Sequence, residues 1–580
     1  MHLMYRSKTR ILLSMIALLG IVGAMLVAAV TARTTYAASA SAASTQFHGT
    51  PGAATRLSTS RPLLTSPTNA GGKRMIDNHI PTRSVNGAAM LAGSRISSTA
   101  LDKTEGTLLH NFNGLSDINQ AAVNGGSGVG EVTPPDQGLC VGFDPGVPGT
   151  KVVFQAINSA LRETSVNNSP LPGAPLLGNK DVSFANFWEP GAFSDPRCFF
   201  DFSTHTFFFT VIGTLQTGPD KGNTAIDIAV FNSSGFAVYQ IDSSFGGADF
   251  GDQPHVGFDN NALYASTDEF NVAGTAYFGA ALWVISKSQL VATVPSPAFV
   301  SFGPLSLAGI PILTLEPAIS TTSTNTEYLL NSFPFADADI TPNPISQQLG
   351  FWTVTHDSGV SNGHPGSVTL TGTIIRSETY GFPVNAVSTG TGVTDKNGIT
   401  SEAFLNPDDS RMLQVQFING HLWAALTTAI SINNDPAARD GVAWFNVDAV
   451  AGKVSTQGYI ASQGNYLIYP AILRTTEGTT AITFTITSAT INPSAAYVVR
   501  PSTSSHFGVI HISASGFGPH LSFSDTLPVV GRPRWGDYSA AALDPNGTDI
   551  WLATEYIPSP ANQDPFDNWG TRVFDTHGDA

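Results

Sequence analysis

The chain has 580 residues, and its 27 Lys and Arg against 43 Asp and Glu give a formal net charge of −16 at pH 7. Nucleic acids and anionic membrane surfaces are bound by clustered Lys and Arg, so this acidic balance argues against both as partners. Cations, metal ions and neutral glycans remain as ligand classes.

The N-terminal segment has the features of an export signal. Basic residues precede an apolar run from Ile11 to Val30, and the small residue Ala37 fits a cleavage site. We expect residues 1–37 to be a signal peptide, although the run is also long enough to persist as an uncleaved anchor. The protein is therefore expected to be secreted or to lie on the extracellular face of the cell envelope, touching a membrane only through such an anchor.

Residues 38–105 follow, and they are rich in Ser, Thr, Ala and Gly with few aromatic residues. Such a composition buries too little apolar surface to offset the entropy of ordering the chain. We interpret this stretch as a disordered spacer and residues 106–580 as the folded domain.

A short pattern recurs in the folded domain. An acidic or polar residue, often beside Pro, precedes an apolar strand ending in Asp, then a turn and a second apolar strand ending in Thr or Ser. Such self-similarity is typical of repeat architectures. The turns Asn260-Asn261, Asn419-Gly420 and Asn546-Gly547 lie between the two strands, and Asn-Gly favours a tight hairpin. The seven copies begin near Asp136, Asp195, Asp252, Glu316, Asp409, Tyr469 and Asp537.

Each copy contains about four short strands rich in aromatic and β-branched residues, and the 3.6-residue period of long helices is nearly absent. We therefore predict an all-β chain, folded as a seven-bladed β-propeller in one ring. Three strands are evident after Asp537, so the segment from Gly106 to Phe112 is predicted to supply the fourth and close the ring. The alternative is that this segment is a disordered leader.

The two cysteines, Cys140 and Cys198, lie in the first strands of neighbouring copies. Export would permit a disulfide between them, but the separation of two inner strands could also exceed the reach of a bridge. A disulfide and two buried thiols both remain open. The cysteine and histidine spacing does not predict a structural zinc site.

The first strand of each propeller blade lines the central channel, so side chains at the strand entrances converge on one mouth. Crowded carboxylates require a cation, an arginine or a shared proton, and oxygen ligands favour Ca²⁺ over a transition metal. Each acid taken singly could instead fix a turn or cap backbone N–H groups. The predicted ligand-binding residues are Asp136, Asp195, Arg197, Asp252, His255, Glu316, Arg411, Arg534, Trp535 and Asp537.

The motif from Arg534 to Ser539 is the densest group of functional side chains. Trp535 and Tyr538 could stack on a sugar face while Arg534 and Asp537 bond its hydroxyl groups. In the alternative interpretation, Trp535 packs in the seam between the first and last blades and the arginine pairs with the aspartate.

Several of these motifs together resemble exported bacterial β-propeller proteins of uncharacterised function, over about residues 106 to 575. They are Pro134-Pro135-Asp136, Ser194-Asp195-Pro196-Arg197, residues 422–428, Tyr469-Pro470-Ala471 and residues 534–539. The resemblance implies the fold and brings no activity. A more distant likeness is to sialidases, but their repeated Ser-x-Asp-x-Gly-x-x-Trp turn is missing, so no arginine triad can be carried over.

We therefore expect a secreted or surface-tethered monomeric propeller that binds a glycan or cell-surface polymer at the channel mouth. One alternative is a glycoside hydrolase of sialidase-like type that uses the channel-mouth carboxylates. A second alternative is a non-catalytic scaffold of the cell envelope, since fold likeness alone is a weak warrant for function.

Overall fold

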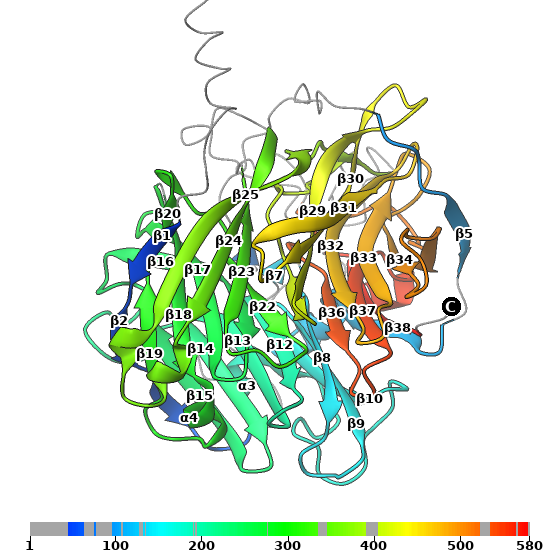
Figure 1. Cartoon of the computed structure of the whole chain (residues 1–580). Coiled ribbons are helices and arrows are strands. Elements are labelled where there is room, and N and C mark those ends of the chain that lie inside the picture. Colours follow the sequence, from blue (N-terminus) through cyan, green and yellow to red (C-terminus); the bar gives the residue numbers. More distant parts are fainter. Residues whose placement is uncertain are drawn as a thin grey trace, which may run out of the picture. The chain divides into compact units, whose positions relative to one another are not determined.

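Short antiparallel strands joined by tight turns make up most of the chain (Figure 1). The computed structural model describes residues 44–62, 75–76, 95–105, 108–126, 132–133, 135–188, 191, 194–274, 276–333, 345–389, 404–522, 534–563 and 567–577. Residues 45–580 form one compact unit. The expected export signal at 1–37 lies outside the described residues. Among those described, no helix combines the length and the apolar character needed to cross a membrane.

The strands fall into successive antiparallel groups of four. The first groups are β8 (Gly138–Phe143), β9 (Lys151–Ile157), β10 (Ala160–Ser165) and β11 (Val182–Ser183); β12 (Ser194–Asp201), β13 (Thr206–Thr214), β14 (Thr224–Asn232) and β15 (Gly235–Asp242); and β16 (Asp249–Phe258), β17 (Ala262–Asn271), β18 (Tyr277–Ser286) and β19 (Ala298–Phe302). Next come β22 (Glu316–Ser320), β23 (Glu327–Ser332), β24 (Ile345–Thr355) and β25 (Thr369–Gly381), then β28 (Val415–Ile418), β29 (His421–Ser431), β30 (Ala438–Asp448) and β31 (Lys453–Ile460). The last groups are β32 (Tyr466–Arg474), β33 (Thr480–Thr487), β34 (Ser494–Arg500) and β35 (Ile510–Ala514), and β36 (Ala540–Leu543), β37 (Ile550–Tyr556), β38 (Gly570–Thr576) and β6 (Asn111–Ser116).

The first strands of these groups are neighbours. Strand β16 pairs in parallel with β22, and β22 pairs in parallel with β28. Contacts also join β28 to β32, β32 to β36, β36 to β8, β8 to β12 and β12 to β16. The succession of first strands therefore returns to its starting point, and the arrangement is propeller-like.

Smaller elements occupy the connections. They are the strands β7 (Val132–Thr133), β20 (Ser306–Leu307), β21 (Ile310–Pro311), β26 (Ala386–Val387) and β27 (Phe404–Leu405), the helices α2 (Asp117–Asn124), α3 (Phe184–Phe187) and α4 (Lys287–Val291), and the 3-10 turns η1 (Asp357–Val360), η2 (Pro365–Ser367) and η4 (Pro560–Asn562).

The hairpin turns lie where the sequence predicts them. Asn419 and Gly420 join β28 to β29 with φ angles of 49° and 80°, the left-handed region that Asn and Gly tolerate best. Gly547, with a φ of 78°, likewise lies between β36 and β37. These predictions are confirmed.

Aromatic and β-branched side chains fill the space between adjacent sheets. Between β8–β11 and β12–β15, for example, Phe154 contacts Phe207 and Phe209 edge to face, with ring centroids 4.9 and 5.1 Å apart. Such pairs contribute on the order of 1 kcal/mol each beyond the burial of their surface. Packing between sheets therefore holds neighbouring groups together without long helices.

A disulfide between Cys140 in β8 and Cys198 in β12 also joins two neighbouring first strands, with the Cα atoms 5.4 Å apart. This distance lies within the usual range for a bridge. Of the two alternatives that the sequence left open, the structure contains the disulfide.

An N-terminal strap, residues 45–58, runs along the outer edges of three of the strand groups. Strand β1 (Thr45–His48) pairs with β25, β2 (Thr50–Ala53) with β19, and β3 (Thr55–Ser58) with β15, all antiparallel. Further along, β4 (Met75–Ile76) pairs with β7 and β5 (Leu101–Glu105) with β35. The expectation of a disordered spacer over 38–105 does not hold for these segments. Their side chains offer little apolar surface to bury, but the free edges of the outer strands provide hydrogen-bond partners for their backbone.

Strand β6 pairs antiparallel with β38, although their sequence positions lie more than 450 residues apart, as in Phe112 opposite Val573. The sequence predicts this strand at Gly106 to Phe112, whereas β6 begins at Asn111 and ends at Ser116. The segment thus reaches the last group a few residues later than expected, directly before helix α2.

Candidate functional site

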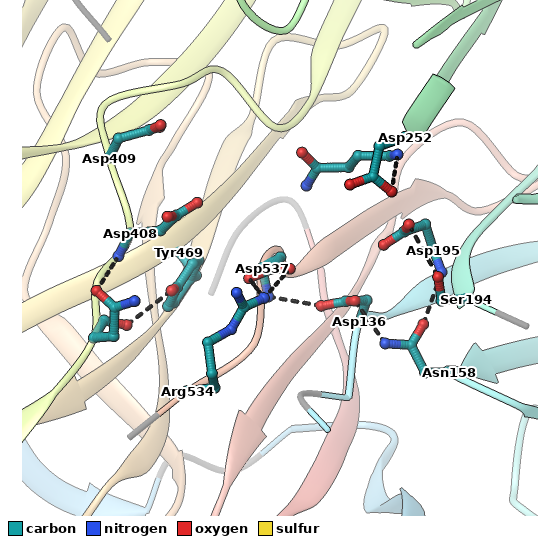
Figure 2. Close-up of polar contacts among 12 residues, drawn as sticks. Asp136, Asn158, Ser194, Asp195, Asp252, Asp408, Asp409, Tyr469, Arg534 and Asp537 are labelled. Atoms are coloured by element: carbon teal, nitrogen blue, oxygen red, sulfur yellow. Dashed lines mark hydrogen bonds and ion pairs between the residues drawn. The ribbon is translucent and has the colours of Figure 1, made fainter. Parts of the chain in front are cut away.

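The repeated acids lie at the entrances of the first strands, and all of them are buried. Asp136, Asp195 and Asp537 are at most 1% exposed, and Asp252, Glu316, Asp408 and Asp409 are at most 8% exposed. Figure 2 shows several of these side chains directed toward one region from separate strands. The structure therefore brings three of the predicted acids, Asp136, Asp195 and Asp537, into one group.

A backbone irregularity at the strand entrance accounts for this convergence. Asp195, Gln253, Asp408 and Tyr469 all have φ angles between 45° and 57°, an uncommon conformation for residues other than Gly. In β12, β16 and β32 the pairing register shifts at the same place. Such bulges redirect a side chain out of the regular strand alternation.

The tightest group is the axial trio, which consists of Asp136, Asp195 and Asp537. One carboxylate oxygen from each lies within 4.8 Å of the others. Asn158 holds two of them, because its Nδ2 donates to Asp136 Oδ2 at 2.6 Å and its Oδ1 accepts from the Asp195 N–H at 2.8 Å. The Asp537 N–H donates to Asp136 Oδ1 at 2.8 Å (Figure 2). The entrances of three first strands, β8, β12 and β36, are thus tied to one point.

Two arginines compensate acids at the entrance. Arg534 Nη2 lies 2.8 and 2.7 Å from the two carboxylate oxygens of Asp537. Arg411 donates from Nε and Nη2 to Asp409 at 2.9 and 2.8 Å, and its Nη2 lies 3.2 Å from Asp408 Oδ2. These buried, forked pairs are charge-assisted hydrogen bonds of the strong kind.

Arg197 and His255 belong to a second set of polar side-chain contacts. The guanidinium of Arg197 stacks over the Tyr538 ring, 3.4 Å from its centroid, and its Nη2 lies 3.1 Å from His255 Nδ1. The same ring nitrogen lies 2.5 Å from Glu316 Oε2. The Tyr538 hydroxyl donates to the carbonyl of Pro196. Residues predicted singly from three copies are therefore linked in one network.

Trp535 has a different environment from the one needed for sugar stacking. Its side chain is 0% exposed, its Nε1 donates to Thr485 Oγ1 at 3.1 Å, and the ring of His520 meets it edge to face. It packs in a hydrophobic cluster with Leu405, Tyr466 and others. The structure thus buries this indole, and its hydrogen-bond partner lies on β33 of the sixth group, so these contacts match neither sugar stacking nor packing between the first and last groups.

One acid of the entrance, Asp408, has a shifted pKa. Burial raises the pKa of Asp408 to about 6, while Arg411 acts to lower it and the neighbouring Asp409 to raise it. Burial also raises the pKa of Tyr469 well above its usual range, and its hydroxyl donates to the Asn406 carbonyl at 2.8 Å. A carboxyl group that titrates near pH 6 lies here among acids and arginines.

Sequence reasoning missed the neutral residues of the entrance. Asn158 lies in the turn between β9 and β10, and Gln253 accepts from Arg411 Nη1 at 2.5 Å. Gln253 thus contacts another copy of the repeat, and Asn158 joins Asp136 of its own copy to Asp195 of the next. Four entrances share a residue with a left-handed backbone conformation. This common feature is seen in the backbone angles and could not be read from the sequence.

Chemically, the entrance offers oxygen ligands and hydrogen-bond acceptors. The separations within the axial trio suit three monodentate carboxylate ligands of one Ca²⁺. Carboxylates of this kind also accept hydrogen bonds from hydroxyl groups.

No protein-family model matches the chain, and no curated protein matches it. Among solved structures it is similar to the Dos1 propeller, with 8% identity, 81% of this chain and 94% of that chain covered, and a TM-score of 0.34. It is similar to the α-L-arabinofuranosidase Arb93A from Fusarium graminearum, with 9% identity, 81% and 98% covered, and a TM-score of 0.31. It is also similar to the phage phi92 endosialidase, with 7% identity, 67% of each chain covered, and a TM-score of 0.35. These TM-scores are too low to support a function, so the propeller-like fold rests on the strand pairing and contacts.

Proposed function

We propose that this protein is an exported, seven-bladed β-propeller that binds a glycan or cell-surface polymer at the entrance of its central channel. The closed succession of first strands supports a ring, and the pairing of β6 with β38 supports closure by an N-terminal strand. Each of the groups from β8–β11 to β36–β38 with β6 would then be one blade.

The observation that carries the proposal is the axial trio, in which one carboxylate oxygen from each of three strand entrances lies within 4.8 Å of the others. The described acids of the entrance, Asp136, Asp195, Asp252, Glu316, Asp408, Asp409 and Asp537, outnumber the basic residues Arg197, His255, Arg411 and Arg534. A ligand that supplies hydroxyl donors or positive charge complements this excess. Neutral glycans supply the first and Ca²⁺ the second.

A glycan array tests the proposal with the full chain. We expect binding by the wild-type protein, loss of binding in Asp195→Asn, and no change in Asp181→Asn, whose carboxylate pairs with Arg162 on β10. Repeating the array with a calcium chelator shows whether a cation takes part. Equal glycan binding by Asp195→Asn and wild type, with both folded, would refute the entrance as the binding site.

The hydrolase alternative is favoured by one observation. Asp408, with a pKa raised to about 6 by burial, lies next to a second carboxyl group, Asp409, and a glycosidase uses a pair of carboxyl groups, one of them an acid with a raised pKa. In that case the protein releases product from fluorogenic glycosides and Asp408→Asn abolishes the release. A protein that gives neither array binding nor turnover but recovers protein partners in pull-downs would instead be the envelope scaffold.

A further inference from the structure

Two arginines lie at the opposite end of β32 from the entrance residue Tyr469. Arg474 is the last residue of β32, and Arg500 is the last residue of β34. Strand β33 runs between them, and its first residue, Thr480, is the cross-strand partner of both. Strand pairing therefore places the two arginines on either side of one threonine.

Their guanidinium groups converge on that threonine. Arg474 Nη1 donates to Thr480 Oγ1 at 2.9 Å, and Arg500 Nη2 lies 3.3 Å from the same oxygen. Two positive charges are thus held within a few ångströms of each other. We call these residues the arginine pair.

The arginine pair lies against aromatic rings. The Cζ atoms of Arg474 and Arg500 are 4.9 and 4.6 Å from the ring centroid of Trp423, which β29 contributes from the preceding group. Arg500 also lies 5.6 Å from the Trp444 ring and 5.7 Å from the Phe507 ring. These rings hold the guanidinium planes in place and exclude water from them.

Neither charge has an acidic partner. Within the part of the chain that the structure describes, the ion pairs include neither Arg474 nor Arg500, and Arg500 Nε is buried with no hydrogen-bond acceptor. Arg500 is 7% exposed, whereas Arg474 is half-buried and reaches solvent. Burial lowers the pKa of Arg500 to about 10, and repulsion from Arg474 acts in the same direction. Both groups still carry their charge at pH 7.

We propose that the arginine pair binds an oxyanion, namely a carboxylate, sulfate or phosphate group. Forked guanidinium donors match the geometry of such groups, and their hydrogen bonds to anions are stronger than those between neutral partners. An anion between the two charges would also relieve their repulsion. The site is separate from the channel entrance and does not depend on the function proposed there.

Isothermal titration of the full chain with sodium sulfate and sodium phosphate at pH 7 tests this inference, with sodium chloride at equal ionic strength as reference. We expect saturable binding of the oxyanions. Because a hydrogen bond to a charged group contributes about 1.5–3 kcal/mol, Arg474→Gln and Arg500→Lys should each weaken binding by about 10- to 100-fold. Arg500→Lys retains the charge and guards against loss of fold.

Arg439→Gln is the matched control. Its guanidinium lies 5.0 Å from the Tyr466 ring but is paired with Asp435 at 2.9 Å, so its loss should leave oxyanion binding unchanged. Titration with an oligosaccharide that carries uronate or sulfate groups tests whether such a glycan is the source of the oxyanion. A natural ligand of this kind should bind more tightly than free phosphate, and its binding should depend on both Arg474 and Arg500. Absence of saturable binding, or equal binding by wild type, Arg474→Gln and Arg500→Lys, would overturn the proposal.

Discussion

The channel entrance and the arginine pair use the same residue type under opposite conditions. At the entrance, Arg411 and Arg534 each fork onto a buried aspartate. At the other end of β32, Arg474 and Arg500 share a threonine hydroxyl and lie on aromatic rings. Arginine paired within the fold stabilises it, whereas arginine left without an acid retains the capacity to bind an anion from solution.

A third region shows how burial acts on two acids that lie close together. The side chains of Asp259 and Asp357 interact with each other. The hydroxyl of Tyr264 donates to Asp357 at 2.6 Å. Burial raises the pKa of Asp259 to about 8, and the proximity of Asp357 raises it as well. A carboxyl can thus neutralise itself by taking up a proton. A guanidinium cannot lose its proton in the physiological range, so the arginine pair needs an outside anion.

The largest effect should come from the paired arginine. Replacing Arg411 by Gln leaves Asp409 and Asp408 buried without their cation, and we expect a loss of about 3–5 kcal/mol in the free energy of unfolding. Arg439→Gln, which breaks a partly exposed pair, should cost about 1 kcal/mol or less. Urea denaturation measures both. Similar losses of unfolding free energy for Arg411→Gln and Arg439→Gln would contradict the expected difference between a fully buried and a partly exposed ion pair.

The next effect concerns Asp259, which lies beside Asp357, and it depends on pH. Between the ordinary pKa of 3.8 and the raised value of about 8, folded Asp259 holds a proton that the unfolded chain releases. The free energy of unfolding should therefore fall as pH rises across this window, by at most about 1.4 kcal/mol per unit. Asp259→Asn should remove that component of the slope. Denaturation curves from pH 5 to 9 provide the measurement, and an unchanged slope would contradict it.

Replacing Thr480 by Val should have a smaller effect. The change removes the acceptor shared by Arg474 and Arg500, and we expect a loss of about 1 kcal/mol in the free energy of unfolding. Sulfate binding should weaken as well, because the guanidinium groups lose their common anchor. Thermal unfolding and titration report the two effects, and unaltered sulfate affinity would mean that the threonine does not orient the pair.

The smallest effect should come from Arg474→Gln in chloride. Removing one of two repelling charges costs no ion pair, so we expect the free energy of unfolding to stay within about 0.5 kcal/mol of wild type. Urea denaturation in chloride tests this. A loss as large as that of Arg411→Gln would show that the arginine pair is a structural element of the same kind as the entrance.

The sequence predicts the strand groups because each one repeats the same local chemistry. Turns such as Asn419-Gly420 and the acids at the strand entrances carry that chemistry in neighbouring residues. The repeat predicts that acids at the strand entrances converge, but it does not single out Asp136, Asp195 and Asp537 as the three that meet. The contacts of Asn158 with the Asp136 carboxylate and the Asp195 N–H cannot be predicted from the repeat either, since Asn158 lies in a turn outside the repeated pattern.

The strap could not be predicted from hydrophobic pattern. Strand β2 contains Thr50, Pro51 and Gly52 and pairs with β19 through its backbone. A Cβ atom at Gly52 would collide with the Phe299 ring, so the strand needs a residue type that ordinarily indicates flexibility. The arginine pair was missed for a related reason, because Arg474 and Arg500 become neighbours only through strand register.

The strap also sets an order of events during biosynthesis. Thr45 pairs with Gly372, Thr50 with Ser301 and Thr55 with Gln240, so the strap is synthesised well before the strands that pair with it. Contacts of such sequence separation form slowly. The strap therefore stays unpaired until residues 240 to 372 have been made, and the outer edges of these strand groups stay open until it docks.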